Sequence, residues 1–221
     1  MDDVEAIAAL RDPVRRRLYE YVAAQDHEVS RNEAAEAMGV QRTLAAFHLD
    51  KLAEAGLLET TGRRLTGRSG PGAGRPAKLY RRAAAERVVS VPPRDYRTAA
   101  ELLAEAAEEA ELDERLWRAA RLRGRELARD AGPVRGLDEA EALLARRGYE
   151  PVREQTPAGA VLRMRNCPFH VLSERFPPLV CGMNLALLEG AFEGSADLAP
   201  RMDPRPGWCC TVLAASKNNE D

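Results

Sequence analysis

Residues 29–58 read VSRNEAAEAMGVQRTLAAFHLDKLAEAGLL and contain two short helical patterns separated by one glycine. Ser30 is followed three residues later by Glu33, a capping box that predicts the start of a helix, and Gly39 is expected to end it. A second helix is predicted over residues 41–55, where another glycine follows. Two helices joined by a glycine-containing turn of this length form a helix-turn-helix unit.

In such a unit the N-terminal part of the second helix enters the major groove of DNA. The side chains expected to face outward, toward bases or phosphates, are Gln41, Arg42, Thr43, Ala46, His48 and Lys51. Those expected to pack inward are Leu44, Phe47, Leu52, Leu57 and Leu58. Arg42 is the expected base reader, because a guanidinium group can bind both acceptors of a guanine edge. Upstream, residues 2–24 predict one amphipathic helix or two short ones, with Pro13 as the break.

Downstream, the strand-like stretches LLETT and AKLYRR flank a loop rich in glycine and arginine. Residues 61–94 hold nine Arg or Lys residues and one acid, Glu86, although the whole chain has a formal net charge of −2. A cationic block in an otherwise acidic chain indicates a polyanionic partner. We therefore interpret the loop as a DNA-contacting wing and not as a disordered linker. The expected wing contacts are Arg63, Arg64, Arg68, Arg75 and Lys78.

Three segments carry a family resemblance: ALRDPVRRRLYEYV, RTLAAFHLDKLAEAGLLE and GPGAGRPAKLYRR. Together they resemble the winged helix-turn-helix domain of ArsR-type bacterial transcriptional regulators, over about residues 4–85. The resemblance implies a homodimer that binds a palindromic operator in double-stranded DNA.

The DNA-binding domain is predicted to span residues 1–90, because Pro92 and Pro93 prevent a helix from continuing across the boundary. Residues 91–131 are expected to form a helical linker with an apolar stripe. The stripe comprises Ala99, Leu103, Ala106, Ala110 and Trp117, continued by Leu112, Leu116, Ala120 and Leu127. Two interpretations stay open, a dimerisation seam or a helix packed on its own C-terminal domain.

Residues 132–221 show an α+β pattern. LDEAEALLARRGYEPV and PPLVCGMNLALLEGAFEG predict helices, whereas GAVLRMRNC and WCCTVLAA predict strands. The expected fold class is therefore α+β, with an N-terminal winged helix-turn-helix domain, a helical linker or dimerisation segment, and a C-terminal α+β domain that holds all four cysteines.

Between Cys167 and Cys181 lie 13 residues, and between Cys181 and Cys209 lie 27, so neither interval is the Cys-x-x-Cys knuckle of a structural zinc site. Four unevenly placed cysteines also do not suit a secreted disulfide scaffold. Cys181 is predicted in the first turn of a helix, where the helix dipole favours thiolate. Cys209 and Cys210 are adjacent in a predicted strand and should point to opposite faces, so only one of them is expected to join the other two thiols.

The segments NCPFH, LVCGMNLALLEG and WCC resemble the C-terminal half of iron–sulfur-dependent repressors that control cluster-assembly operons. This resemblance implies an iron–sulfur cluster held by Cys167, Cys181 and one of Cys209 and Cys210. Some of those repressors have a further cysteine between the second and last positions, which this chain lacks. His170 is the nearest candidate for a fourth ligand. The alternatives are Glu174, Asp197, Asp203 and a small external ligand.

The expected function is thus a DNA-binding transcriptional repressor whose operator binding is modulated by the C-terminal cysteine sensor domain. One alternative is a regulator that senses a small ligand or thiol oxidation without a metal. Another is an enzyme with Cys167 and His170 as a nucleophile pair, which is disfavoured because no third group is evident to orient the pair, so no enzyme is expected. No apolar stretch resembles a signal peptide or a membrane span, so a cytoplasmic protein with no membrane partner is expected.

Overall fold

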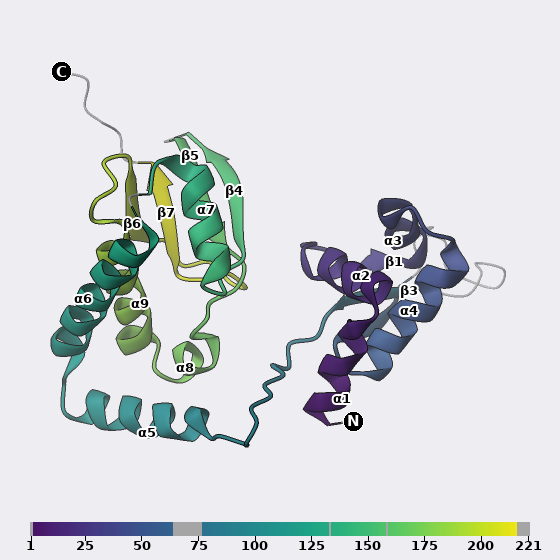
Figure 1. Cartoon of the computed structure of the whole chain (residues 1–221), viewed down its shortest axis with the longest axis horizontal. Coiled ribbons are helices and arrows are strands. Elements are labelled where there is room, and N and C mark those ends of the chain that lie inside the picture. The colour runs from purple at the N-terminus through teal and green to yellow at the C-terminus, as the bar shows by residue number, and fades with distance from the viewer. Residues whose placement is uncertain (1, 64–76, 133, 158, 216–221) are drawn as a thin grey trace. The chain divides into compact units, whose positions relative to one another are not determined.

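The computed structural model describes residues 2–63, 77–132, 134–157 and 159–215. It divides into two compact units, Met1–Arg94 and Asp95–Asp221 (Figure 1). Each unit combines helices with one antiparallel sheet, which confirms the mixed helix-and-sheet class. None of the helices in the described ranges is both long and apolar enough to cross a membrane.

The first unit opens with two helices and not with a single continuous one. α1 spans Asp3–Ala8, a 3₁₀ turn η1 spans Ala9–Arg11, and α2 spans Pro13–Ala23. Asp12 separates the helices, and its carboxylate accepts hydrogen bonds from two backbone N–H groups of the first turn of α2. Proline at the first helical position fits there because that position has no intrahelical partner for an N–H group. Of the two interpretations of residues 2–24, two short helices is correct.

The helix-turn-helix forms as the capping signals predict. α3 spans Arg31–Met38 and α4 spans Arg42–Glu54. The Ser30 hydroxyl accepts a hydrogen bond from the backbone N–H of Glu33, whose carboxylate accepts one from the Ser30 N–H. Gly39 ends α3 in the left-handed region with φ +64°, which favours glycine. Both predicted helices are therefore confirmed.

A three-stranded sheet completes this unit, in the order β1 (Val29–Ser30), β3 (Ala77–Arg82) and β2 (Leu58–Arg63). β2 and β3 pair antiparallel with Leu58 opposite Arg82, which confirms the two strands expected around the wing. The core between helices and sheet is built mainly from α2, α3 and α4, with Tyr80 from β3. Its buried side chains include Leu18, Val22, Ala45, Leu49, Leu52 and Tyr80.

One carboxylate, Asp50 of α4, joins three elements of the first unit. Its Oδ1 accepts hydrogen bonds from Lys78 Nζ and from the Tyr80 hydroxyl, both at 2.7 Å. Its Oδ2 accepts one from Arg31 Nη2, also at 2.7 Å. Burial by itself would raise the pKa of Asp50, but the hydrogen bonds from Lys78, Tyr80 and Arg31 outweigh it and lower the pKa. The ionised carboxylate therefore links α3, α4 and β3.

The second unit contains a four-stranded antiparallel sheet in the order β4, β5, β7, β6. These strands are Pro151–Thr156, Gly159–Met164, Thr211–Ala215 and Leu198–Met202, respectively. The sequence predicted β5 and β7 and missed the two edge strands, β4 and β6. β7 begins at Thr211, so Cys209 and Cys210 precede the strand in which they were expected.

In the described part of the same unit there are five helices, and Figure 1 shows α7 lying over the sheet and α6 running beside α9. Their bounds are α5 Tyr96–Glu109, α6 Asp113–Ala131, α7 Gly136–Arg146, α8 His170–Arg175 and α9 Pro177–Phe192. α5 and α6 are grouped with the second unit, which begins at Asp95; residues 91–131 were expected to form a helical linker or dimerisation segment. α8 was not predicted from the sequence.

The backbones of α6 and α9 approach each other closely at two glycines. A Cβ atom on Gly190 would lie 2.1 Å from the carbonyl oxygen of Arg121. A Cβ atom on Gly124 would lie 2.1 Å from the carbonyl oxygen of Leu187. Both distances are far below a van der Waals contact, so this helix pair requires glycine at both positions.

The predicted apolar stripe of residues 91–131 is divided between core and surface. The ring of Trp117 fills the space over Gly182, and its Nε1 donates a hydrogen bond to the Leu179 carbonyl oxygen at 3.1 Å. Ala120 is buried as well. On α5 and at its C-cap the stripe is instead exposed, at Ala99, Leu103, Ala106 and Ala110. The α6 half therefore packs within its own unit.

We predict that Gly190→Ala lowers the free energy of unfolding of the second unit by about 3 kcal/mol, because the added methyl group forces α6 and α9 apart. Urea denaturation followed by tryptophan fluorescence measures this, since Trp117 and Trp208 both lie in that unit. Gly194→Ala is the control, because a Cβ atom there meets nothing within 4 Å. Equal stability of the two variants would contradict the close approach of the helices.

We also predict that Asp50→Asn destabilises the first unit by about 2 kcal/mol at neutral pH, since a charged acceptor of three hydrogen bonds is lost. The folded-state pKa lies below the unfolded value of about 3.9, so the contribution is present above that value and disappears as the pH falls through the folded pKa. Urea denaturation followed by the amide NMR signals of Leu49 and Leu79 reports on this unit alone.

The control for Asp50→Asn is Glu54→Gln, which removes an exposed carboxylate paired with Lys51 and should change stability by less than about 0.5 kcal/mol. The stability difference between wild type and Asp50→Asn should shrink in acid. A difference that stays constant from pH 7 to pH 3 would show that the Asp50 charge contributes nothing.

Candidate nucleic-acid interface and cysteine cluster

The N-terminal end of α4 presents an exposed polar surface. Gln41 caps the helix, and Gln41, Arg42 and Thr43 are exposed, as expected. Within the described residues, Arg42 has no ion-pair partner, so its guanidinium group is available to an external acceptor. Lys51, near the other end of the helix, is also exposed and pairs with Glu54 at 2.7 Å.

His48 does not belong to this surface, and the outward position expected for it is wrong. Only 5% of His48 is exposed. Its Nδ1 accepts a hydrogen bond from Arg15 Nε at 3.4 Å, and it shares the inward face of α4 with Leu49 and Leu52. Ala46, also expected outside, is half-buried. A buried imidazole cannot reach a base edge.

Two apolar residues expected in the core lie on the outside of α4 instead. Leu44 is 41% exposed and Phe47 is 53% exposed. The inward face consists of residues 45, 48, 49 and 52, at helical spacing, so positions 44 and 47 fall beside it. Exposed apolar side chains next to Arg42 can contact the methyl groups of thymine. Helical spacing alone places Leu44 and Phe47 beside the inward face of α4, whereas the size of their side chains indicated burial.

Cations of the wing strands are mostly paired within the unit. Lys78 binds Asp50, and Arg81 Nη2 pairs with Glu59 at 2.7 Å. Arg63 ends β2. The remaining expected wing contacts, Arg64, Arg68 and Arg75, lie outside the described residues.

In the second unit three segments bring the cysteines together. Cys167 follows β5, Cys181 lies in α9, and Cys209 and Cys210 directly precede β7. The backbone N–H of Cys209 donates a hydrogen bond to the carbonyl oxygen of Met164, the last residue of β5, at 2.9 Å. This bond holds the β6–β7 connection beside the end of β5, next to the segment that carries Cys167.

A buried arginine fixes the start of that connection. Arg163 is 1% exposed, and its guanidinium donates to Asp203 Oδ2 at 2.6 Å, to the Asp203 carbonyl oxygen at 3.0 Å and to Glu154 Oε2 at 2.8 Å. The Arg163 hydrogen bond lowers the pKa of Asp203. The Asp203 N–H in turn donates to the carbonyl oxygen of Cys210 at 2.8 Å. The hydrogen bond between Asp203 and Cys210 therefore joins the two ends of the connection between β6 and β7.

The four thiols lie near one another in a line, in the order Cys181, Cys210, Cys209, Cys167, and neighbouring thiols in this order shift each other's pKa. Cys209 and Cys210 therefore both take part, and the expectation that only one of them could do so is wrong. The physical reason is that they lie in the irregular segment before β7, where side chains of neighbouring residues need not alternate as in a strand.

The thiol with the lowered pKa is Cys167 and not Cys181. A hydrogen bond from the Cys209 thiol lowers the pKa of Cys167, and the backbone N–H of Phe169 contributes to the shift. Burial raises the pKa of Cys181 to about 12. Cys181 is the fifth residue of α9, beyond the first turn, so the helix dipole acts on it less than the sequence indicated. The pKa of Cys209 is raised to about 11, chiefly by its hydrogen bond to Cys167.

A fully buried asparagine supports the cluster from α9. Asn184 is 0% exposed, and its Nδ2 donates to Cys209 Sγ at 3.4 Å. Its Oδ1 accepts a hydrogen bond of 2.5 Å from the hydroxyl of Tyr149, whose pKa is raised by burial. Sequence reasoning missed both residues. The signal was a single amide in the otherwise apolar run GMNLALL of a buried helix.

The donor set agrees with an iron–sulfur cluster in type and number, because such clusters are held by four thiolates. Its present geometry does not form a single-ion site: in the described part of the chain, no three His, Cys, Asp or Glu side chains converge on one ion position. His170 begins α8, its side chain is 61% exposed, and its Nε2 lies 3.3 Å from Glu174 Oε1. The Asp203 carboxylate forms an ion pair with the buried Arg163.

An open hollow of about 600 Å³ reaches the outer end of the thiol line. Cys181 and Cys210 line it together with Trp117 and Met202. The two inner cysteines, Cys167 and Cys209, are absent from its lining as far as the described residues show. External reagents or a metal can therefore approach the cluster from the side of α6 and α9.

Residues 10–61 match the model of a family described as a helix-turn-helix domain. Neither a curated protein nor a solved structure matches the chain. The matched segment covers α2, α3, α4 and most of β2, the elements that carry the exposed surface of Arg42. The chain therefore contains a helix-turn-helix domain of the kind that binds DNA in transcription regulation.

Proposed function

We propose that this protein is a transcriptional repressor that binds DNA as a homodimer and whose operator affinity is set by the thiol cluster of the second unit. The observation that carries the proposal is the combination of a helix-turn-helix domain with four interacting cysteines in a separate unit of the same chain. A helix-turn-helix domain joined to a cysteine cluster can act by binding DNA and responding to a signal, without catalysis.

The exposed end of α4 supports the DNA-reading part of the proposal. Arg42 binds a guanine edge, and Gln41 and Thr43 bind neighbouring bases or phosphates. Leu44 and Phe47 add apolar contacts, whereas His48 positions α4 from inside. The wing and Lys51 supply phosphate contacts.

The exposed stripe of α5 supports homodimerisation. Tyr96 and Leu103 are 73% and 72% exposed and lie seven residues apart, on the side that also carries Ala99 and Ala106. Large apolar side chains at this spacing form a helix seam with a second copy. A two-fold dimer presents two α4 helices and therefore reads a palindromic operator with half-sites about 34 Å apart.

The sensor part of the proposal assigns an iron–sulfur cluster to Cys167, Cys181, Cys209 and Cys210. The fourth thiol makes a ligand role for His170 unnecessary. When bound, the cluster would supply chemistry that responds to oxidants and to iron supply. The chain positions its ligands through Arg163, Asn184 and the Cys209–Met164 hydrogen bond.

We expect Arg42→Ala to abolish sequence preference. Binding sites selected from random DNA with the full-length protein should lose at least tenfold affinity in this variant, because a bidentate arginine–guanine contact contributes about 1–3 kcal/mol. Fluorescence anisotropy at fixed salt measures the effect. Lys51→Ala is the comparison and should weaken all sequences equally. Unchanged preference in Arg42→Ala would overturn the base-reading role.

We expect anaerobically purified protein to be coloured, with stoichiometric iron and sulfide. Cys167→Ser and Cys181→Ser should each lose the visible absorption, whereas His170→Ala should keep it. Iron, sulfide and zinc analysis with visible spectra checks this. A colourless, metal-free wild-type protein that still binds its operator would refute the cluster and leave the DNA-binding assignment intact.

The proximity of the Cys167 and Cys209 thiols, which shift each other's pKa, favours a second candidate, a peroxide-responsive switch. Peroxide oxidises Cys167 to a sulfenic acid with release of water, and the Cys209 thiol then forms a disulfide with release of a second water. In that case the metal-free protein gains one disulfide on peroxide treatment, detected by mass spectrometry without reductant, and operator affinity changes with it.

A further inference from the structure

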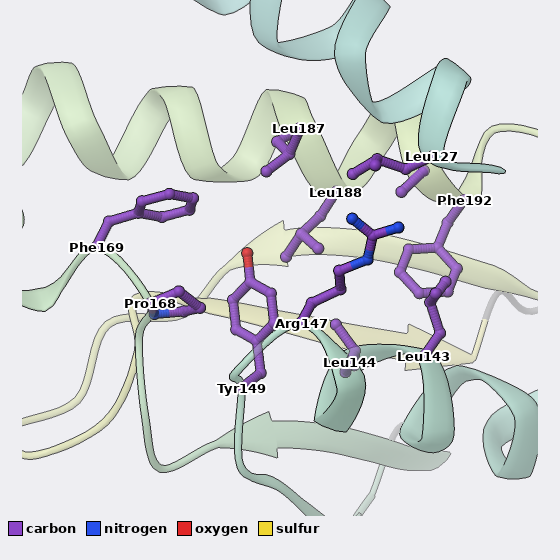
Figure 2. A pocket seen from close by; sticks show the side chains of 11 residues that line it. Leu127, Leu143, Leu144, Arg147, Tyr149, Pro168, Phe169, Leu187, Leu188 and Phe192 are labelled. Carbon is purple, nitrogen blue, oxygen red and sulfur yellow. The ribbon is translucent and has the colours of Figure 1, made fainter. Parts of the chain in front are cut away.

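A second cavity in the second unit is lined in part by Tyr149. It holds about 160 Å³ and is lined mainly by apolar side chains from α6, α7 and α9. Figure 2 shows Leu127, Leu143, Leu188 and Phe192 around it, with Phe169 at the far end. An apolar cavity of about 150 Å³ accommodates a benzene-sized molecule.

One cation, Arg147, lines this apolar space. In the view of Figure 2 its guanidinium group lies near Leu127, Leu188 and Phe192, and Arg147 as a whole is exposed. In the described part of the chain no carboxylate pairs with Arg147. Its neighbour Arg146 also belongs to the end of α7 but does not line the cavity. An unpaired guanidinium beside apolar walls favours an anion that carries an apolar body.

The cavity wall is continuous with the thiol cluster at two points. The Phe169 ring lines the cavity, and Phe169 follows Cys167 by two residues, with its backbone N–H lowering the pKa of the Cys167 thiol. Tyr149 lines it as well, and its hydroxyl reaches Cys209 through Asn184. A molecule bound in the cavity therefore restrains Phe169 and Tyr149, and with them the surroundings of the Cys167 and Cys209 thiols.

We propose that this cavity binds a small aromatic monocarboxylate, with the ring among the leucines and the carboxylate on Arg147, and that its occupancy restrains the Cys167 end of the thiol cluster. Arginine suits this role because its planar fork binds a carboxylate through two parallel hydrogen bonds. The restraint of Cys167 matters for regulation only if the proposed function holds, whereas binding of the carboxylate is independent of it.

The binding test uses the full-length, metal-free, reduced protein and three probes: benzoate, benzamide and acetate. Benzamide keeps the ring without the charge, and acetate keeps the charge without the ring. We expect benzoate to bind at least tenfold more tightly than either, as measured by chemical-shift titration. Equal affinity for benzoate and benzamide, or no saturable binding of benzoate, would overturn the site.

Two variants locate the binding. Arg147→Gln should weaken benzoate at least tenfold and leave benzamide unchanged, whereas the matched control Arg146→Gln should leave both unchanged. Leu127→Trp fills the cavity from the half-buried face of α6 and should exclude all ring-containing probes. An equal loss of benzoate affinity in Arg147→Gln and Arg146→Gln would indicate a general effect of positive charge and would contradict the assignment.

The coupling is tested by alkylation. Saturating benzoate should slow the reaction of Cys167 with iodoacetamide at least threefold, as followed by peptide mass spectrometry. Cys181, which faces the other hollow, is the internal control and should react at an unchanged rate. If Cys167 reacts equally fast with and without benzoate, the link between cavity and thiols is wrong, whatever the outcome for the cluster or for DNA binding.

Discussion

The contact between the backbones of α6 and α9 at Gly124 and Gly190 determines the rest of the second unit. Because no side chain separates these helices at the two glycines, their backbones are in direct contact. α9 can then bury its opposite face on the sheet. That face carries Asn184, and the same helix carries Cys181. A steric requirement at two glycines therefore places two of the groups that build the thiol cluster.

The sequence predicted best where local chemistry decides the structure. Ser30, Glu33 and Gly39 define the ends of α3 through hydrogen bonds and backbone conformation within a few residues, and these features are confirmed. On α4 the prediction failed for Phe47 and His48. Residue type placed the aromatic ring inside and the imidazole outside, whereas the structure does the reverse because the partners that bury His48, including Arg15, come from a distant element.

The cluster was predicted in composition and not in arrangement. The sequence identified the cysteines, but the expected alternation of Cys209 and Cys210 assumed that both lie in a strand, whereas β7 begins only at Thr211. The roles of Arg163 and Asn184 depend on pairing across the sheet and on helix packing, which no local pattern encodes. Buried polar residues in apolar runs were the available signal, because such groups are retained only where they find partners.

Pairing of cations inside the DNA-binding unit has a consequence for measurements on DNA. Lys51, Lys78 and Arg81 each hold a carboxylate of their own unit. When such a cation meets a phosphate, it exchanges one anionic partner for another and leaves a carboxylate unneutralised near the DNA. The dependence of affinity on salt concentration reflects the net number of counterions released. The salt dependence of the affinity will therefore indicate fewer phosphate contacts than the number of cations that contact the DNA backbone.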